Sequence, residues 1–313
     1  MILTVTLNPS VDRALEVDAL VRGEVLRAGD SHIDPGGKGV NVTRALLSNG
    51  IRSTAVVPTG GAEGDQLIDL LKAEGVDMLA VPIAGRTRSN ITLAEPDGTV
   101  TKINEVGPVL SDAEFQQVSE AVLTAAAAAD WVVICGSLPP GPGIAAFTDL
   151  CERLVAAGTR LAVDSSGPAL LAGVTAGASL VKPNREELAE AIGAELCTLG
   201  DVVAACEKLR RAGAGTVLAS LGADGAVLVD EAGVLAGTSP VSVPRSTVGA
   251  GDALLAGFLA AGARGYAALV EGLAWGAAAV SLPGSRMPGP GDLDRTTVQL
   301  NHTPDPSRPL RSD

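Results

Sequence analysis

The sequence predicts an α/β fold in which a doubly wound, mostly parallel sheet is covered by helices on both faces. Short runs of β-branched residues alternate with stretches rich in Ala and Leu, which is typical of consecutive βαβ units. Several of these runs are continuously apolar, as strands buried on both faces are. Glycine follows four of the helical stretches, at Gly50, Gly75, Gly158 and Gly213. A glycine is favoured just after the C-terminus of a helix, so these positions mark helix ends.

The 313 residues suffice for one large domain, which we place at residues 1–300. Strands are predicted at Ile2–Leu7, Thr54–Pro58, Trp131–Cys135, Arg160–Asp164, Ser179–Lys182, Thr216–Ser220 and Ala226–Asp230. Helices are predicted at Val40–Ser48, Asp65–Glu74, Asp112–Ala128, Ile144–Ala156, Glu186–Ile192, Val202–Ala212, Asp252–Ala261 and Tyr266–Val280. Residues 301–313 are polar and rich in proline, which predicts a disordered tail.

Two segments break the alternation of strands and helices, Ala14–Ile33 and Ser89–Glu105. Each alternates apolar and polar residues as a strand does, and neither contains a crossover helix. The second segment carries a Pro-Asp-Gly turn. We predict that residues 14–33 and 89–105 form a small antiparallel sheet beside the main domain, where it could act as a lid. A pair of solvent-facing hairpins is the alternative.

The composition excludes several classes of protein. Hydrophobic residues make up 46% of the chain, too many for a disordered protein. The net charge of −13 speaks against a nucleic-acid binder, which needs a basic surface. We find neither an apolar run long enough to span a membrane nor a signal peptide, and therefore expect a cytoplasmic protein. The four cysteines and two histidines form no metal motif, no disulfide framework and no setting for a Ser–His–Asp triad.

The strongest chemical motif is Ser246-Thr-Val-Gly-Ala-Gly-Asp252, which is followed directly by an apolar helix. A glycine-rich turn at a helix N-terminus directs backbone N–H groups to one point, and the helix dipole adds partial positive charge. Such a nest holds an anion, typically phosphate. Asp252 lies beside it and could take a proton from an attacking hydroxyl. A tight turn with an Asp helix cap is the alternative. The motif is neither a Walker A loop nor a Rossmann fingerprint.

Two further motifs stand at helix starts. In Asp34-Pro-Gly-Gly-Lys-Gly-Val-Asn41, glycines allow a ligand to approach the backbone, Lys38 offers a charge to a phosphate, and Asn41 can bond to hydroxyls. A helix entry with a solvated lysine is the alternative. In Val181-Lys-Pro-Asn184-Arg-Glu-Glu187, Asn184 and Glu187 share a helix face and could hold Mg²⁺ through water. They could also form a capping box, and both interpretations can hold together.

Weaker signals lie at strand ends and in the predicted lid. Asp12 and Ser137 follow predicted strands, where open α/β sheets bind ligands. Arg88 and Lys102 lie in or beside the predicted lid. Singly these are ordinary solvated charges, but together with Lys38 they would form a local anion pocket in an acidic chain.

In this order, the strings TLNPSVD, PGGKGVN, GRTRSN, TKINEVGP, CGSLPPG, VDSSG, VKPNREE, SLGADGA and STVGAGD resemble the PfkB, or ribokinase-like, family of carbohydrate kinases across residues 1–281. Within that family the chain is most similar to the phosphosugar kinases. The resemblance implies a ribokinase-like fold, ATP and Mg²⁺ as cofactors, and a phosphorylated ketohexose as substrate. Fructose 1-phosphate is the favoured substrate, with fructose 6-phosphate and tagatose 6-phosphate as alternatives. A nucleoside or free-sugar kinase and a non-catalytic sugar sensor also remain open.

The resemblance also assigns roles to individual residues. It implies that Asp252 is the catalytic base and that Gly249, Ala250 and Gly251 form the anion hole. Sugar contacts are implied for Asp12, Gly37, Lys38 and Asn41, and contacts to the phosphate on the sugar for Arg88, Ser137 and Lys102. Asn184 and Glu187 would position Mg²⁺ and phosphate, and Lys182, Asn184, Ser220, Gly222 and Gly225 would line the nucleotide side. The lid would cover the sugar, and two lids would meet in a homodimer.

Overall fold

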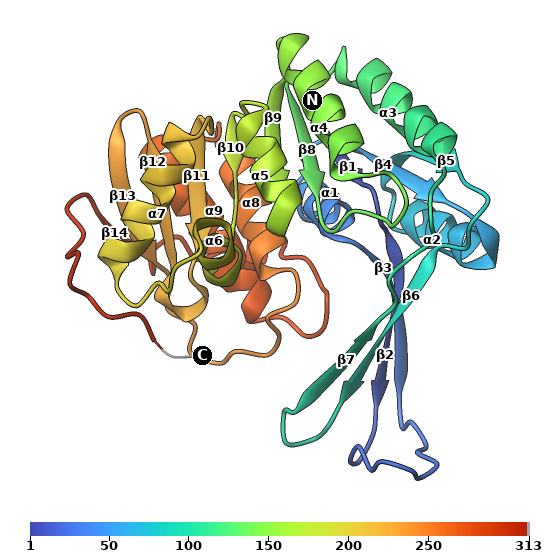
Figure 1. Ribbon diagram of the computed structural model, residues 1–313. Coiled ribbons are helices and arrows are strands. Elements are labelled where there is room, and N and C mark those ends of the chain that lie inside the picture. The colour runs from blue at the N-terminus through green and yellow to red at the C-terminus, as the bar shows by residue number, and fades with distance from the viewer. Residues whose placement is uncertain (312–313) are drawn as a thin grey trace.

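The computed structural model describes residues 1–311. Its centre is a ten-stranded sheet with the order β14-β13-β12-β11-β10-β9-β8-β1-β4-β5 (Figure 1). The strands from β5 to β11 run parallel, and β12, β13 and β14 are antiparallel at one edge. The strands are β1 (Ile2–Thr6), β4 (Ser53–Thr59), β5 (Asp77–Pro82), β8 (Trp131–Cys135), β9 (Arg160–Asp164), β10 (Leu180–Val181), β11 (Thr216–Ser220), β12 (Ala226–Asp230), β13 (Gly233–Thr238) and β14 (Gln299–Asn301).

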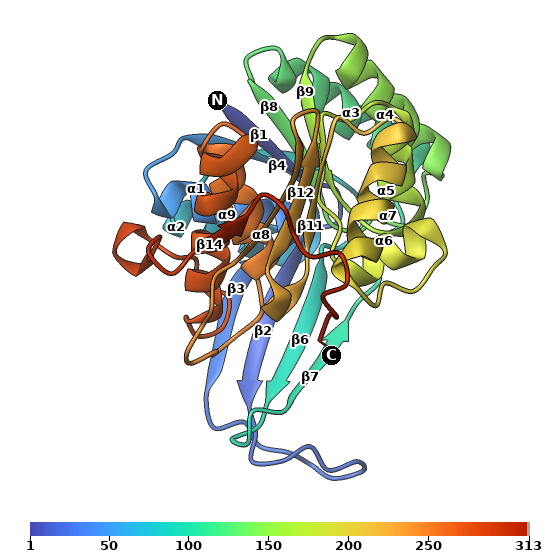
Figure 2. The ribbon, with the colours of Figure 1, turned by 90° about the vertical axis from the view of Figure 1, so that its left-hand side faces the viewer.

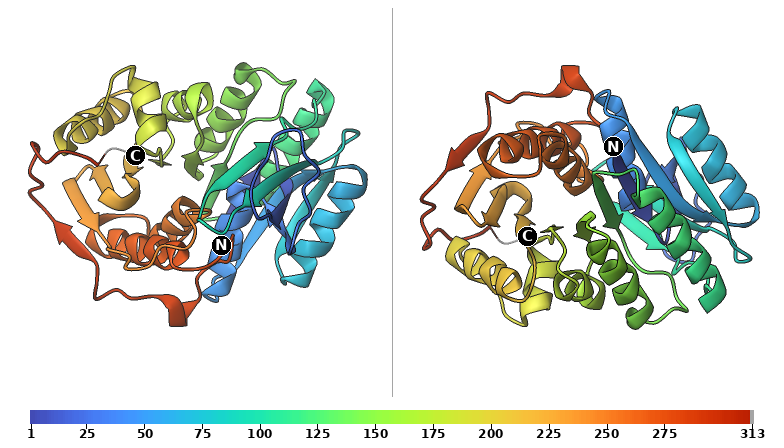
Figure 3. Two further views of the ribbon diagram at one scale, coloured as in Figure 1. Left: turned by 90° about the horizontal axis from the view of Figure 1, so that it is seen from below. Right: turned by 90° about the horizontal axis from the view of Figure 1, so that it is seen from above.

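Helices cover both faces of this sheet, as predicted (Figure 3). One face carries α1 (Lys38–Ser48), α2 (Gly61–Ala73), α8 (Ala250–Ala260) and α9 (Gly265–Val280), and the other carries α3 (Asp112–Ala126), α4 (Ile144–Ala156), α5 (Gly167–Thr175), α6 (Arg185–Ile192) and α7 (Leu199–Arg211). Strand residues alternate between the two cores: Val132 packs with α3 and α4, and Val133 packs with α8. The sheet is therefore buried on both sides, which explains its continuously apolar strands.

The sequence-based boundaries agree closely where strands and helices alternate. Four strands, β8, β9, β11 and β12, and the helix α4 have the predicted bounds. The elements β5, α5, β13 and β14 were not predicted. Six of the nine residues of α5 are buried, so the helix lacks the polar face that would mark its period. The main sheet contains β14 because a short segment near the C-terminus pairs with β13, a long-range contact without a local signal.

A second sheet stands off the main domain (Figures 1 and 2). It contains β2 (Ser10–Glu16), β3 (Ser31–Gly36), β6 (Arg88–Ala94) and β7 (Val100–Asn104) in the order β3-β2-β6-β7. The pairs β2–β3 and β6–β7 are antiparallel, as predicted, but β2 and β6 run parallel. Both strands follow parallel strands of the main sheet, β1 and β5, so they leave that sheet in the same direction. Residues 17–30 form no strand, and the prediction of strands throughout 14–33 is wrong there.

The C-terminal residues differ from expectation. The sequence predicts a disordered tail for residues 301–313. In the structure residues 301–311 are ordered: they pair first with β13 and then, through Pro309, with Thr198 at the start of α7. Leu310 packs against the main core, and its N–H donates to the carbonyl of Cys197 at 2.9 Å. These contacts are invisible in a polar, proline-rich sequence because they depend on the surface that receives it. Residues 312 and 313 lie outside the described residues. No helix within residues 1–311 is long and apolar enough to cross a membrane.

Candidate active site

The two glycine motifs meet at the packed starts of α1 and α8. Gly249 is the N-cap of α8 and has a left-handed φ of 74°, a conformation that favours glycine. Asp252 lies in the first turn of α8 and is only 6% exposed. Nδ2 of Asn41, in the first turn of α1, donates a hydrogen bond of 2.8 Å to Oδ2 of Asp252. The structure thus joins the side chain expected to act as a base to the PGGKGVN motif.

A buried carboxylate, Asp164 at the end of β9, forms ion pairs with both Lys38 and Lys182. Its Oδ1 lies 2.8 Å from Nζ of Lys38, and its Oδ2 lies 2.9 Å from Nζ of Lys182. Lys38 also donates to Oε1 of Glu187 at 3.1 Å. Asp164 is fully buried and was not predicted as a site residue. Its signal in the sequence was its position at the carboxyl end of a parallel strand, where such sheets bind ligands.

Burial and neighbouring charges set the protonation of this cluster. Burial, and then the negative charge of Asp164, raise the pKa of Asp252 to about 6. Burial would also raise the pKa of Asp164, but Lys182 and Lys38 outweigh that effect and lower it. Burial acts to lower the pKa of Lys38, and the carboxylates of Asp164 and Glu187 reverse this and raise it. At neutral pH Asp252 is therefore ionised, yet more basic than an ordinary aspartate.

The NREE segment forms the capping box that was one of its two interpretations. Oδ1 of Asn184 accepts from the N–H of Glu187 at 2.7 Å, and the N–H of Asn184 donates to Oε2 of Glu187 at 2.8 Å. The other oxygen of Glu187 accepts from Lys38. All three oxygens are thus occupied, so these residues fit Mg²⁺ held through water and not by direct ligation. Residues 1–311 contain no cluster of three or more His, Cys, Asp or Glu side chains suited to a metal.

The other residues expected at the nucleotide side lie beside this box. Ser220 forms a bridge with Asn184, and its N–H donates to the carbonyl of Pro183 at 3.0 Å. Gly222 begins the short helix η1 (Gly222–Asp224) and Gly225 follows it, with φ angles of 56° and 91°. A Cβ on Gly225 would lie 1.9 Å from the carbonyl oxygen of Gly237, so only glycine fits there. The ammonium group of Lys182 lies near the start of α8, since a Cβ on Gly251 would lie 3.4 Å from its Nζ.

Asn8 connects the base of the small sheet to the loop after β8. Its carbonyl accepts from Nε of Arg88 at 3.1 Å, and its Nδ2 donates to Oγ of Ser137 at 3.3 Å. Arg88 and Ser137, the two expected phosphate contacts, therefore lie around one residue. The ammonium group of Lys38 instead belongs to the Asp164 cluster. Within residues 1–311, Lys38 and Arg88 share no hydrogen-bond partner.

One face of the small sheet is polar. Asp12 pairs with Asn90 and Asn90 with Asn104, so their side chains share a face. Nδ2 of Asn90 donates to Oδ1 of Asp12 at 2.8 Å. Lys102, opposite Thr92, belongs to the next row of that face and is exposed. The polar face continues to Asp34 on β3, which accepts at 2.7 Å from Oγ of Ser285 in the main domain. This face is thus turned toward the main domain, as a lid requires.

Three buried amide oxygens at this junction accept no hydrogen bond from the described residues: Oδ1 of Asn8, Asn41 and Asn90. Buried polar atoms are nearly always paired, so three unpaired acceptors favour a ligand that donates from hydroxyl groups. Asn41 was expected as a sugar contact, whereas Asn8 and Asn90 were missed. Their only signal was their place in the strings TLNPSVD and GRTRSN.

The last of the predicted site residues, Gly37, is required by the conformation of the backbone. Gly37 is the N-cap of α1 with a φ of 118°, and a Cβ there would lie 2.6 Å from Cγ2 of Thr6. The loop before α1 can therefore pass close to β1 only with glycine at this position. The segment Ser285–Met287, for which the sequence predicts no contacts, packs against β3 and the start of α8. A Cβ on Gly249 would lie 2.7 Å from Cε of Met287.

A buried carboxylate beside a glycine-rich helix start, on a doubly wound sheet with a second polar sheet, is the arrangement expected of a phosphoryl-transfer enzyme. The profile of the pfkB family carbohydrate kinases matches residues 5–288. The chain belongs to this family and is a phosphotransferase.

Several relatives are similar over nearly the whole chain. The 1-phosphofructokinase of Haloferax volcanii is 40% identical over 308 residues, 96% of this chain and 97% of that protein. The 1-phosphofructokinase of Rhodobacter capsulatus is 39% identical over 268 residues, 84% of each chain. The structure of phosphofructokinase-2 from Escherichia coli in complex with substrates and products has a TM-score of 0.88 and 36% identity, covering 93% of this chain and 96% of that one. These matches confirm the predicted ribokinase-like fold.

Proposed function

We propose that this protein is an ATP-dependent kinase of ketohexose phosphates that converts fructose 1-phosphate to fructose 1,6-bisphosphate. The observation that carries the proposal is the buried carboxylate of Asp252, hydrogen-bonded to Asn41 at the anion nest of α8. The names of the relatives in Haloferax and Rhodobacter support fructose 1-phosphate. The E. coli relative named ATP-dependent 6-phosphofructokinase isozyme 2, 36% identical, makes fructose 6-phosphate the second candidate.

In this mechanism the protein positions two substrates and stabilises charge. Asp252 accepts the proton of the sugar hydroxyl as that oxygen attacks the γ-phosphorus of ATP, and ADP leaves. Backbone N–H groups of Ala250 and Gly251 face the charge on the transferring phosphoryl group. Asn41 orients the carboxylate of Asp252. The polar face of the lid covers the sugar and excludes water, which limits hydrolysis of ATP.

Other residues bind the parts of the two substrates that do not react: the phosphate and hydroxyl groups of the sugar, and the remaining phosphates of ATP. Arg88 and Ser137 hold the phosphate already on the sugar, and Asp12 and Asn90 bond to its hydroxyls. Lys182 faces the phosphates of ATP. When bound, Mg²⁺ neutralises charge on those phosphates, and Glu187 with Asn184 would hold it through water.

The test is ADP release with Mg·ATP and a panel of acceptors: fructose 1-phosphate, fructose 6-phosphate, tagatose 6-phosphate, free fructose and adenosine. We expect kcat/KM for fructose 1-phosphate to exceed the others by ~10² or more, because the phosphate site must be filled for productive binding. A preference for a 6-phosphate would replace the substrate and keep the catalytic residues. Turnover of only fructose or adenosine would overturn the phosphate site, and sugar binding without turnover would indicate a sensor.

The rate should depend on pH through Asp252. Because its pKa is about 6 and the base acts when deprotonated, kcat should fall as pH decreases below about 6. Phosphate groups on the substrates also titrate near pH 6, so a variant must separate the two. The hydrogen bond from Asn41 lowers the pKa of Asp252, and Asn41→Ala should therefore move the acidic limb to higher pH. If the fall in kcat occurs at the same pH in Asn41→Ala as in the parent, the titrating group is a substrate phosphate and not Asp252.

Arg88→Ala should raise the KM of the sugar phosphate about tenfold or more and change the KM of ATP little. The physical reason is the loss of a charge-assisted hydrogen bond to phosphate. Arg86→Ala is the matched control, because Arg86 is an exposed neighbour that pairs with Glu105 and Glu63. Steady-state kinetics with each substrate varied in turn checks this. Equal changes in both KM values would contradict the assignment.

We also propose a homodimer formed through the lid. Opposite the polar face, Leu15 pairs with Leu93 and Ile91 with Ile103, an apolar row that is half-buried or, at Ile103, 54% exposed. A second lid would cover this row. Leu93→Asp should convert the dimer to a monomer in light scattering, whereas Ile144→Asp on the main domain should not. A parent protein that is monomeric would contradict the proposal.

A further inference from the structure

The C-terminal strap, residues 303–311, follows β14 and crosses the start of α7. The N–H groups of Leu199 and Gly200 donate to the carbonyls of Arg308 and Pro306, both at 2.9 Å. These are the first two residues of α7, whose N–H groups have no partner within the helix. The strap therefore supplies acceptors that this helix end needs. Figure 2 shows the strap, in dark red, running from β14 toward α6 and α7.

The end of the strap contacts the two loops assigned above to the nucleotide. The N–H of Arg311 donates to Oδ2 of Asp224 at 2.7 Å, and Nη2 of Arg308 donates to the carbonyl of Asp224 at 3.3 Å. Asp224 is the last residue of η1, directly before Gly225. On the other side, Nη1 of Arg185 donates to the carbonyl of Arg311 at 2.6 Å, and Arg185 directly follows Asn184.

The strap thus joins η1 to the start of α6, and these two loops are already paired through Ser220 and Asn184. A three-residue 3₁₀ helix has poor hydrogen-bond geometry of its own, so it depends on outside contacts to keep one conformation. We propose that the C-terminal strap positions these loops for nucleotide binding. This inference rests on the proposed function, which places ATP at Ser220, Gly222 and Gly225.

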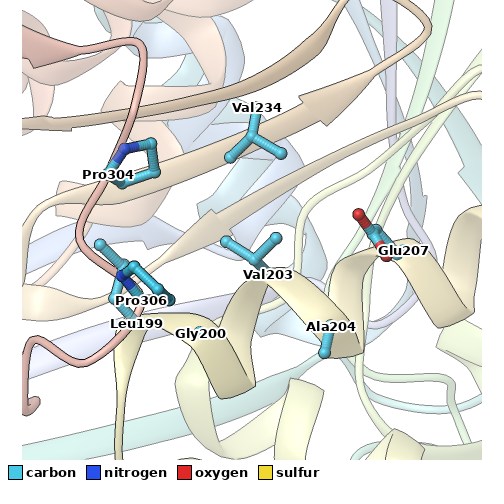
Figure 4. A pocket seen from close by; sticks show the side chains of 8 residues that line it. All are labelled: Leu199, Gly200, Val203, Ala204, Glu207, Val234, Pro304 and Pro306. Atoms are coloured by element: carbon cyan, nitrogen blue, oxygen red, sulfur yellow. The ribbon is translucent and has the colours of Figure 1, made fainter.

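The middle of the strap, around Pro304 and Pro306, can be moved without withdrawing Leu310 from the main core. An apolar cavity of about 300 Å³ lies beneath Pro304 and Pro306, between Val203 of α7 and Val234 of β13 (Figure 4). Pro304 and Pro306 line one side of this cavity, so the middle of the strap borders open space there. Gly200 offers a way to displace it: a Cβ there would lie 2.8 Å from the carbonyl oxygen of Pro306 and 3.0 Å from its Cβ.

The test is Gly200→Ala in the full chain, with Gly291→Ala as control because a Cβ on Gly291 has no neighbour within 4 Å. Alanine suits the first turn of a helix better than glycine, so α7 itself is not weakened. We expect the affinity for Mg·ATP, measured by calorimetry, and the KM of ATP to weaken about tenfold, the effect of losing a hydrogen bond to a charged group. The KM of the sugar phosphate should stay within about twofold.

Hydrogen exchange of residues 303–311 establishes whether the strap has been released. Release with unchanged ATP affinity overturns the proposal, and so does an equal change in both KM values or a fall in Tm alone. If exchange finds the strap still seated, a chain ending at His302 removes it, and unchanged ATP affinity there overturns the proposal equally. Because calorimetry measures ATP binding without turnover, a parent protein that binds ATP but phosphorylates no sugar would defeat the proposed function and leave this test intact.

Discussion

Asp252→Asn is expected to lower kcat by at least ~10², a typical contribution of a general base, while both substrates still bind. Asparagine has nearly the same shape, and its amide oxygen can still accept the hydrogen bond from Asn41. The change therefore removes the proton acceptor and one buried negative charge, and leaves the anion nest in place. In stopped-flow or steady-state assays kcat and kcat/KM should fall together, which marks an interaction made in the transition state.

Binding has to be measured separately to make this result informative. Calorimetric titration of Asp252→Asn with Mg·ATP and with the sugar phosphate should give dissociation constants within a few-fold of the parent. Asp69→Asn, the same change at an exposed position of α2, is the control and should have no effect. An unchanged kcat in Asp252→Asn would remove Asp252 from the reaction and leave its motif as a helix start.

The sequence could predict the parts of this site that are local. Glycines before a helix and polar residues at strand ends act through backbone geometry that a few neighbouring residues determine. For this reason the positions of Asp252, Asn41 and the Asn184–Glu187 box agree with the structure. The same holds for the strands of the parallel region, whose apolar runs report burial on both faces.

The parts that could not be predicted depend on long-range contacts. Asp164 lies 126 residues from Lys38, and no pattern in the chain indicates that one carboxylate serves two lysines. The parallel pairing of β2 with β6 follows from where β1 and β5 end in the main sheet. The tail was assigned to disorder because its composition is polar, whereas its acceptors match the free N–H groups of α7. In each case the partner, not the segment, determines the structure.

Asp164→Asn should cost about 3–5 kcal/mol in the free energy of unfolding, as measured by urea denaturation, because it leaves buried positive charge without a partner. Lys182 is 4% exposed, so its charge cannot be solvated in the folded state. Asp149→Asn is the control, since its pair with Arg153 is exposed and should contribute at most about 1 kcal/mol. A cost below about 1 kcal/mol at Asp164 would contradict the prediction.

Two further measurements separate this charge effect from a general loss of packing. The double variant Asp164→Asn, Lys182→Met removes both buried charges and should recover part of the lost stability, which an independent packing defect would not allow. The pKa of Asp164 is lowered in the folded state, so its stabilising contribution is complete above the unfolded-state pKa of about 4 and is lost as pH falls through the folded-state value. The difference between parent and Asp164→Asn should therefore be greatest near neutral pH and shrink in acid, and a difference independent of pH would assign the effect to packing.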